Sequence, residues 1–240
     1  MAVDAIVDAL EQGELEVQGL MPWSSNYTFL GAVICGDLKF SVVYKPGRGE
    51  RPLWDFDHGS LCNREVAAFL VSRALGNWPA IPPTVLRDGP HGPGSVQQFV
   101  LTDYNVHYFT IQDDPKYHDQ FQRLAIFDYL VNNADRKGGH CLLGEDDVIW
   151  AIDHGLTFHT DHKLRTVIWE YADERIPRDI YADLKAFKQE FQADTPWYQS
   201  LQCLLSAYEL ERLLHRLNKL LKSGRFPTPL GMRDYPYPPV

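Results

Sequence analysis

The chain has 240 residues, of which 45% are hydrophobic, so it is long enough for one large domain or two small lobes around a real core. Its 23 Lys and Arg residues against 32 Asp and Glu residues give a formal net charge of −9. An acidic chain is poorly suited to nucleic acid and to anionic membrane surfaces, so we expect no nucleic-acid partner and at most peripheral membrane contact.

The cysteines and the first residues of the chain indicate a cytoplasmic protein. No two cysteines form a CxxC pair, which argues against a zinc knuckle or a disulfide framework and favours reduced thiols. They lie far apart, at Cys35, Cys62, Cys141 and Cys203. The N-terminal segment is acidic and amphipathic, so no signal peptide is expected. The sequence has no run of about 18 apolar residues, so no transmembrane segment is expected.

Strand patterns dominate the first 100 residues. After a short helix at 4–11, they predict strands at 14–20, 27–35, 38–44, 81–87 and 95–101. A helix at 60–75 interrupts these strands, with apolar residues at helical spacing and Gly76 at its end. Ser60 or Asn63 could cap the start of this helix.

Helical patterns dominate the rest of the chain. They predict helices at 119–132, 179–191, 196–207 and 209–222. The change of pattern near residue 100 is the only plausible boundary. We therefore expect an α+β protein with a strand-rich N-lobe at 1–100 and a mostly helical C-lobe at 101–240.

Two acids frame a short predicted hairpin in the helical half. Asp135 follows the long helix, and Asp153 follows the second strand of a hairpin between Cys141 and Ala151. Such a hairpin would hold both carboxylates at one mouth, beside the imidazole of His140 and a cationic residue. This combination suits metal-dependent phosphoryl transfer.

Two residues upstream extend this constellation. Taken alone, Lys45 is a strand-end lysine of the kind that is usually solvated, and Glu65 is an acid favoured by the helix dipole. Their order is more specific, because a Lys on the third strand and a Glu on the next helix precede an Asp-Arg pair and an Asp-His-Gly segment. Over residues 14–175 this order resembles the protein-kinase-like fold, and more closely its phosphatidylinositol 3-/4-kinase branch. Short actinobacterial proteins of this superfamily look closest overall.

The resemblance implies a bilobal kinase-like fold and an ATP-dependent phosphotransferase that moves the γ-phosphate to a hydroxyl group. Lys45 would neutralise the ATP phosphates, and Glu65 would hold Lys45 in place. Asp135 would orient or deprotonate the acceptor hydroxyl. Arg136, the neighbour of Asp135 in the catalytic pair, would brace the loop or pair with a carboxylate. Asp153 would bind Mg²⁺ or Mn²⁺.

The resemblance also assigns a phosphate-binding turn and an adenine-binding hinge. The turn is Ser24, Ser25 and Asn26, and the hinge is Gln97, Gln98, Phe99 and Val100. The turn is a serine-rich counterpart of a glycine-rich lid, although an ordinary polar hairpin turn would have the same composition.

His140 departs from the family pattern, which has Asn at this position. If the imidazole ligates metal, the site should tolerate Mn²⁺ at least as well as Mg²⁺. If it does not, the protein has lost a ligand, and a nucleotide-binding pseudokinase with a regulatory role becomes credible. A protein nucleotidyltransferase on a kinase-like fold is another alternative, and a non-enzymatic interaction protein with a Pro-rich tail is a remote one.

The sequence is compatible with several kinds of phosphate acceptor. The segment after Phe158 carries cationic and imidazole side chains that could bind an anionic headgroup or form a solvated loop: His159, His162, Lys163 and Arg165. Because the chain is acidic and has no anchor, a small polyol or a protein hydroxyl is as plausible an acceptor as a lipid headgroup.

Overall fold

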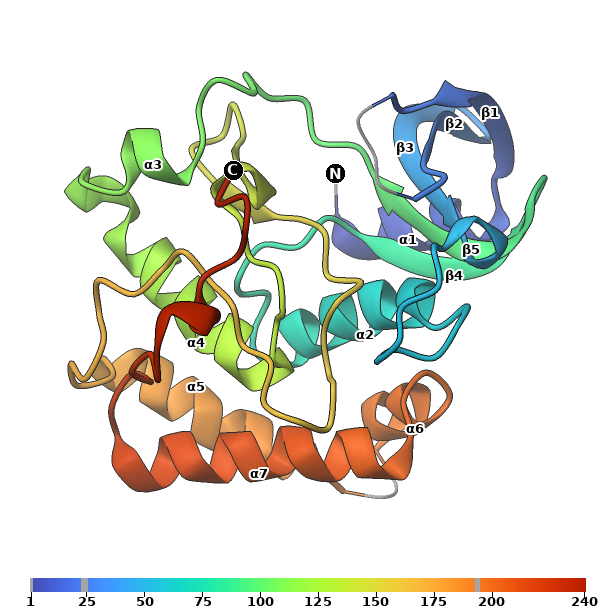
Figure 1. Cartoon of the computed structure of the whole chain (residues 1–240). Coiled ribbons are helices and arrows are strands. Elements are labelled where there is room, and N and C mark those ends of the chain that lie inside the picture. The colour runs from blue at the N-terminus through green and yellow to red at the C-terminus, as the bar shows by residue number, and fades with distance from the viewer. Residues whose placement is uncertain (1, 23–25, 193–194) are drawn as a thin grey trace.

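An antiparallel sheet forms one side of the molecule, and helices form the other (Figure 1). The structure is a computed structural model that describes residues 2–22, 26–192 and 195–240. The strand-rich N-terminal half and the helical C-terminal half confirm the predicted α+β class. No helix among the described residues is long and apolar enough to cross a membrane.

The sheet has five strands in the order β1-β2-β3-β5-β4. Their bounds are β1 Glu14–Leu20, β2 Phe29–Cys35, β3 Leu38–Pro46, β4 Thr84–Gly89 and β5 Gly92–Gln98. The predicted strand at 81–87 begins later, at Thr84, because Pro82 and Pro83 have no N–H to donate to the ladder. Helix α1 (Val3–Gln12) covers one face of the sheet with Ile6 and Leu10.

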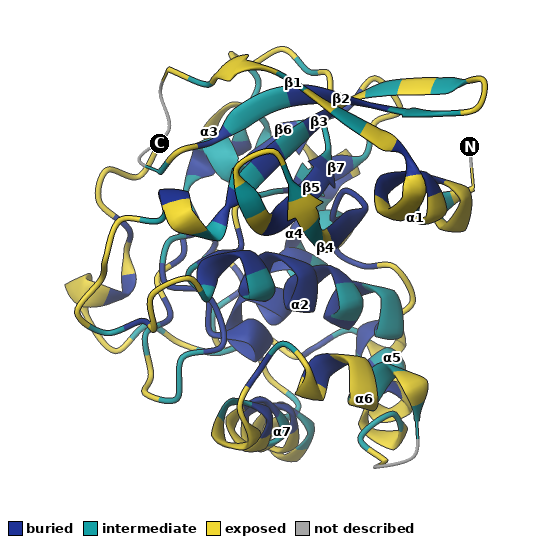
Figure 2. Cartoon of the chain, turned by 90° about the vertical axis from the view of Figure 1, so that its right-hand side faces the viewer, coloured by how far each residue is buried: buried dark blue, intermediate teal, exposed yellow. Residues whose placement is uncertain are grey.

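Helix α2 (Leu61–Ala74) lies between the sheet and the C-terminal helices, and Figure 2 shows it buried along most of its length. Its core residues, among them Phe69 and Val71, belong to the larger of two apolar clusters, which is otherwise built mostly from the helical half. The smaller cluster joins α1 to the sheet. Helix α2 therefore shares an apolar cluster with the helical half while it also contacts β4 and β5 of the sheet.

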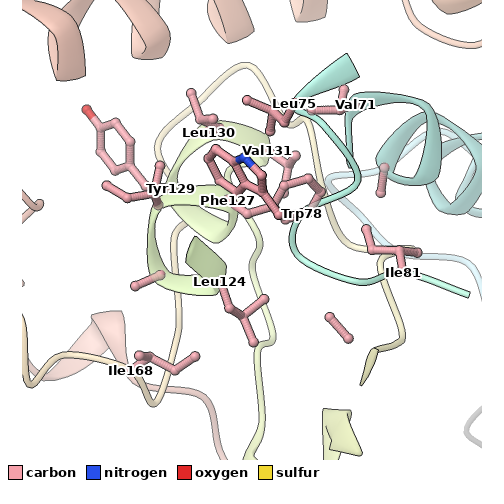
Figure 3. Close-up of a cluster of buried hydrophobic side chains, with 14 of the residues drawn as sticks. Val71, Leu75, Trp78, Ile81, Leu124, Phe127, Tyr129, Leu130, Val131 and Ile168 are labelled. Carbon is pink, nitrogen blue, oxygen red and sulfur yellow. The ribbon is translucent and has the colours of Figure 1, made fainter. Parts of the chain in front are cut away.

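Helix α4 (His118–Val131) lies at the centre of the larger cluster. Figure 3 shows Phe127 and Leu130 of α4 near Leu75 and Trp78, which follow α2. Burying each large apolar side chain contributes roughly 1.5–3 kcal/mol. This packing fixes the end of α4, from which the loop with Asp135 continues.

The remaining elements of the helical half surround α4. They are α3 Tyr108–Ile111, α5 Arg178–Gln189, α6 Pro196–Gln202, α7 Ala207–Ser223, and the hairpin of β6 Cys141–Leu143 with β7 Ile149–Ala151. Short 3₁₀ turns lie at Gly47–Gly49, Pro115–Tyr117, Gly138–His140 and Met232–Asp234.

The boundary between the last two helices differs from the prediction. Helix α6 ends at Gln202, and α7 begins earlier than residue 209 because Ser206 caps it. The Ser206 hydroxyl accepts a hydrogen bond from the Glu209 N–H, and the Glu209 carboxylate accepts one from the Ser206 N–H. This capping box supplies partners for donors that a helix start leaves free.

Candidate active site

A cleft of about 640 Å³ opens between the sheet and the helical half. Its volume lies within the range of small-molecule and cofactor sites, roughly 300–1,000 Å³. It is lined by most of the residues predicted for a nucleotide site, namely Asn26, Lys45, Glu65, Gln97, Gln98, Phe99, Val100, Asp135, His140 and Asp153. Residues that lie far apart in the sequence therefore meet in one concave site.

Lys45 reaches the cleft from the end of β3. Side chains alternate along a strand, so the burial of Tyr44 on the α1 side of the sheet turns Lys45 to the other face. The Lys45 ammonium contacts Glu65 Oε1 of α2 and lies 3.0 Å from Asp153 Oδ1. Glu65 is the more enclosed carboxylate, with 3% of its side chain exposed against 50% for Asp153. One cation thus joins the sheet, α2 and the segment after β7.

Lys45 stabilises the charge of both carboxylates, although burial and the charge of Asp153 raise the pKa of Glu65. Burial alone would lower the pKa of Lys45, but the carboxylates of Asp153 and Glu65 raise it above its ordinary value. Lys45 in turn lowers the pKa of Asp153, against the opposing effect of burial. Both groups are therefore ionised at neutral pH, which a phosphate-binding lysine and a metal-binding carboxylate require.

The backbone at Asp153 has an unusual conformation for a residue other than glycine. Its φ is +60°, in the left-handed region, where such residues are uncommon. The turn places the His154 N–H 2.9 Å from Glu65 Oε2, so both oxygens of Glu65 are occupied, one by Lys45 and one by this backbone. The strained turn after β7 is thereby fastened to α2.

Arg136 does not line the cleft. Its side chain is fully buried and binds both oxygens of Asp128, with Nε 3.0 Å from Oδ2. Arg136 also donates to the Ile152 carbonyl at 2.8 Å, and its Nη2 lies 2.7 Å from Nε2 of His154. Burial and the nearby Arg136 charge lower the pKa of His154, so its neutral ring can accept this hydrogen bond. Arg136 therefore braces the loop from beneath and points away from the cleft.

The inward direction of Arg136 turns its two neighbours toward the cleft. Asp135 and Lys137 both line it, and Lys137 Nζ lies 3.8 Å from Asp135 Oδ2. Sequence reasoning missed Lys137. If Arg136 is known to be buried, its two neighbours are expected to point the opposite way, and this would have identified Lys137. The burial of Arg136 depends on its contact with Asp128, which the sequence around position 136 does not reveal.

Asp135 has a perturbed carboxyl group. Burial raises its pKa to about 6, and the negative charge of Asp153 adds to the effect while Lys137 opposes it. The Asp135 N–H donates to Asn133 Oδ1 at 3.0 Å, which fixes the backbone of the loop. At neutral pH this carboxylate is ionised, and it holds a proton more readily than an exposed aspartate.

His140 lies beside Asp153, with 3.5 Å between His140 Nε2 and Asp153 Oδ2. Burial lowers the pKa of His140 to about 4, so its ring is neutral and one of its nitrogens is an acceptor. The Lys137 N–H lies 3.5 Å from Nδ1. The two side chains offer a nitrogen and an oxygen donor at one point. Among residues 2–22, 26–192 and 195–240, no group of three His, Cys, Asp or Glu side chains is placed to hold a metal ion. The donors suit an ion that takes its other ligands from phosphate and water.

The predicted phosphate-binding turn is only partly visible. Ser24 and Ser25 lie outside the described residues. Asn26 lines the cleft, and its Oδ1 accepts a hydrogen bond from the Arg51 N–H at 2.9 Å, which ties the turn to the loop after β3. The Asn26 amide group therefore has a structural role at the cleft edge.

The predicted hinge continues from β5 along the back of the cleft. The Gln97 side chain donates to Thr84 Oγ1 at 2.8 Å and so points toward β4. The Phe99 N–H donates to the Ser41 carbonyl at 2.9 Å. Within the described chain, the backbone N–H and C=O of Val100 have no backbone partner. Val100 therefore leaves one donor and one acceptor for a ligand.

Of the cations after Phe158, Arg165 lies nearest to the site. Lys163 is engaged elsewhere, because it pairs with Asp55 at 2.7 Å and lies over the Trp54 ring. A parallel bridge between Arg136 and Thr166 places Arg165 beside Asp135. Arg165 is exposed, and its Nε donates to the Arg233 carbonyl at 3.2 Å. The residues that line the cleft include none of the four.

This two-part architecture, with a cleft between a sheet and a helical half, defines the protein-kinase-like fold. Comparison with solved structures agrees. The crystal structure of a Helicobacter pylori proinflammatory kinase, CtkA, matches with a TM-score of 0.53 over 90% of this chain and 94% of that chain. The two sequences are 11% identical, so the likeness is one of fold.

A relative by sequence gives the family. Protein Rv2133c of Mycobacterium tuberculosis (strain ATCC 25618 / H37Rv) is 36% identical over an alignment 262 positions long, which covers 95% of this chain and 93% of that protein. The chain therefore belongs to the same family as protein Rv2133c. No protein-family model matches the sequence.

Proposed function

We propose that the protein is an ATP-dependent phosphotransferase that moves the γ-phosphate of ATP to a hydroxyl group. The observation that carries the proposal is the meeting of Lys45, Glu65, Asp135 and Asp153 in one cleft, although Lys45 and Asp153 are 108 residues apart in the chain. Phosphoryl transfer depends mainly on positioning and on neutralising charge, and these side chains supply both.

In this proposal Lys45 binds the α- and β-phosphates, and Glu65 keeps its ammonium pointed into the cleft. Asp153 and His140 would hold the divalent ion, whose positive charge stabilises the phosphate oxygens during transfer. Lys45 lies 3.0 Å from Asp153 and would turn toward the phosphates when nucleotide and ion enter. The neutral His140 ring supports a ligand role, because a protonated imidazole could not bind a cation.

Asp135 is the proposed base or orienting group for the acceptor hydroxyl. A pKa of about 6 makes its carboxylate a better proton acceptor than an ordinary aspartate while leaving it ionised at pH 7.5. Lys137 is the proposed partner of the transferring phosphate, since its ammonium lies beside Asp135 at the mouth of the cleft.

The adenine would lie along the hinge, Gln97, Gln98, Phe99 and Val100, which lines the cleft, and would pair with the N–H and C=O of Val100. We place the lobe boundary near this hinge, with the N-lobe at 1–100 and the C-lobe at 101–240. We also propose that the chain belongs to the phosphatidylinositol 3-/4-kinase branch, from the Asp135-Arg136 pair and the Ile152-Asp153-His154-Gly155 segment. The acceptor is proposed only as a hydroxyl of a small molecule, lipid headgroup or protein.

Calorimetric titration with ATP and Mg²⁺ or Mn²⁺, together with an assay of ATP turnover, tests the proposal. Wild-type protein should bind and turn over ATP. Asp153→Asn should abolish turnover, and Asp8→Asn, at an exposed acid of α1, should match the wild type. Absence of ATP binding with either ion would overturn the proposal. Binding without turnover would indicate a nucleotide-binding pseudokinase.

A further inference from the structure

Arg64, the residue before Glu65, is a buried cation that faces away from the cleft. Neighbouring residues on a helix point about 100° apart, so Glu65 faces Lys45 while Arg64 faces the C-terminal helices. Its Nη2 lies 2.5 Å from Glu209 Oε1 of α7, and only 6% of its side chain is exposed. Its guanidinium also lies over the Phe56 ring, 4.9 Å from the centroid.

Glu209 is held rigidly at the start of α7. Its Oε2 accepts hydrogen bonds from the N–H and the hydroxyl of Ser206, both at 2.8 Å, while Oε1 faces Arg64. One carboxylate therefore serves the cap of its own helix and the ion pair with α2. Because a charged hydrogen bond in an enclosed site is strong and geometrically specific, this pair fixes where α2 begins relative to α7.

A ring of contacts joins Arg64 to the segment after Asp153. Arg64 Nη1 donates to the Thr157 carbonyl at 2.5 Å. The Thr157 hydroxyl donates to the His154 carbonyl at 2.7 Å, and the His154 N–H donates to Glu65. The ring closes through the backbone of α2. Any shift of Arg64 is thus transmitted to Glu65 by the helix and by the strained turn.

We infer that the Arg64–Glu209 pair is a positioning device by which α7 holds α2 in place, so that Glu65 stays on Lys45. A second contact supports the same helix further along, because Trp197 of α6 donates to the Leu70 carbonyl at 2.8 Å. The C-terminal helices thus hold α2 at two points along its length. The consequence for catalysis rests on the proposed kinase function, whereas the consequence for α2 does not.

The chain offers a matched pair of variants to test this inference. Glu209→Gln keeps a side chain that suits the capping box but removes the charge that Arg64 binds. Ser206→Ala removes the hydroxyl of the cap, but the backbone N–H at position 206 still binds Glu209 Oε2 and the charge that Arg64 binds is kept. Both variants are measured below their melting temperatures, so that global unfolding does not contribute to the result.

Amide hydrogen exchange of the nucleotide-free protein is the first measurement. Glu209→Gln should speed exchange in the first turns of α2 and at His154 on the order of tenfold, the size expected for a lost hydrogen bond to a charged group. Ser206→Ala should speed exchange only around the start of α7. Equal exchange of α2 in the two variants would overturn the inference, whether or not the protein binds ATP.

Steady-state kinetics is the second measurement. Glu209→Gln should raise the KM for ATP and lower kcat, while Ser206→Ala should leave both near the wild-type values. Arg64→Lys keeps the positive charge but loses the planar group of donors of the guanidinium. Its KM and kcat should therefore lie between those of the wild type and those of Arg64→Met. If the wild type turns over ATP and Glu209→Gln matches it, the pair does not position the site. If the wild type neither binds nor turns over ATP, the proposed function fails while the exchange experiment still decides the role of the pair.

Discussion

The buried pair of Arg136 and Asp128 gives a prediction about stability. Asp128→Asn keeps the size of the side chain but leaves the Arg136 guanidinium without its counter-charge, in a place where none of it is exposed. Breaking such a pair by removing one partner costs about 3–5 kcal/mol. For a chain of this length, each kcal/mol lowers Tm by about 2–4 °C, so we expect a drop of roughly 6–20 °C.

Thermal unfolding followed by circular dichroism would measure this change, and an exposed pair provides the control. Lys116 and Asp147 lie 2.6 Å apart, but both side chains are more than half exposed. Asp147→Asn should therefore cost less than about 1 kcal/mol. If Asp128→Asn lowers Tm no more than Asp147→Asn, the argument that Arg136 needs a buried counter-charge is refuted.

Two predictions concern the chemistry of the cleft. Since burial raises the pKa of Asp135 to about 6, turnover should fall about tenfold per pH unit below pH 6, as the base becomes protonated. Asp135→Asn should lower kcat about 10²–10⁴-fold and remove this acid limb of the pH–rate profile; an unchanged limb would assign it to another group. His140→Asn should shift the preference from Mn²⁺ toward Mg²⁺, because an amide oxygen is a harder ligand than an imidazole nitrogen. Equal metal dependence in wild type and variant would remove His140 from the metal site.

Local patterns predicted the elements well. Alternation and helical spacing placed the helix with Glu65, the strand that ends at Lys45 and the short hairpin before Asp153, because these periods reflect which side chains face a core. The meeting of Lys45, Glu65, Asp135 and Asp153 was expected from their order along the chain, and the structure brings these side chains together.

Contacts between distant residues could not be predicted from such patterns. The capping of α2 is an example, because Ser60 and Asn63 were the expected caps. In the structure the Ser60 hydroxyl donates to the Asp57 carbonyl and does not cap the helix. The Cys62 N–H, at the start of α2, instead donates to the Glu50 carboxylate in the loop after β3, at 3.0 Å. The inward direction of Arg136 has the same origin, since its burial depends on a carboxylate of another element.

Helix α2 joins the two halves of the molecule. Its apolar side chains lie in the larger cluster with the helical half, and Arg64 and Leu70 tie it to α7 and α6. The same helix contacts β4 and β5, and its Glu65 holds Lys45 of β3. A change in the width of the cleft would therefore alter the Lys45–Glu65 ion pair and the contacts of α2 with the C-terminal helices together.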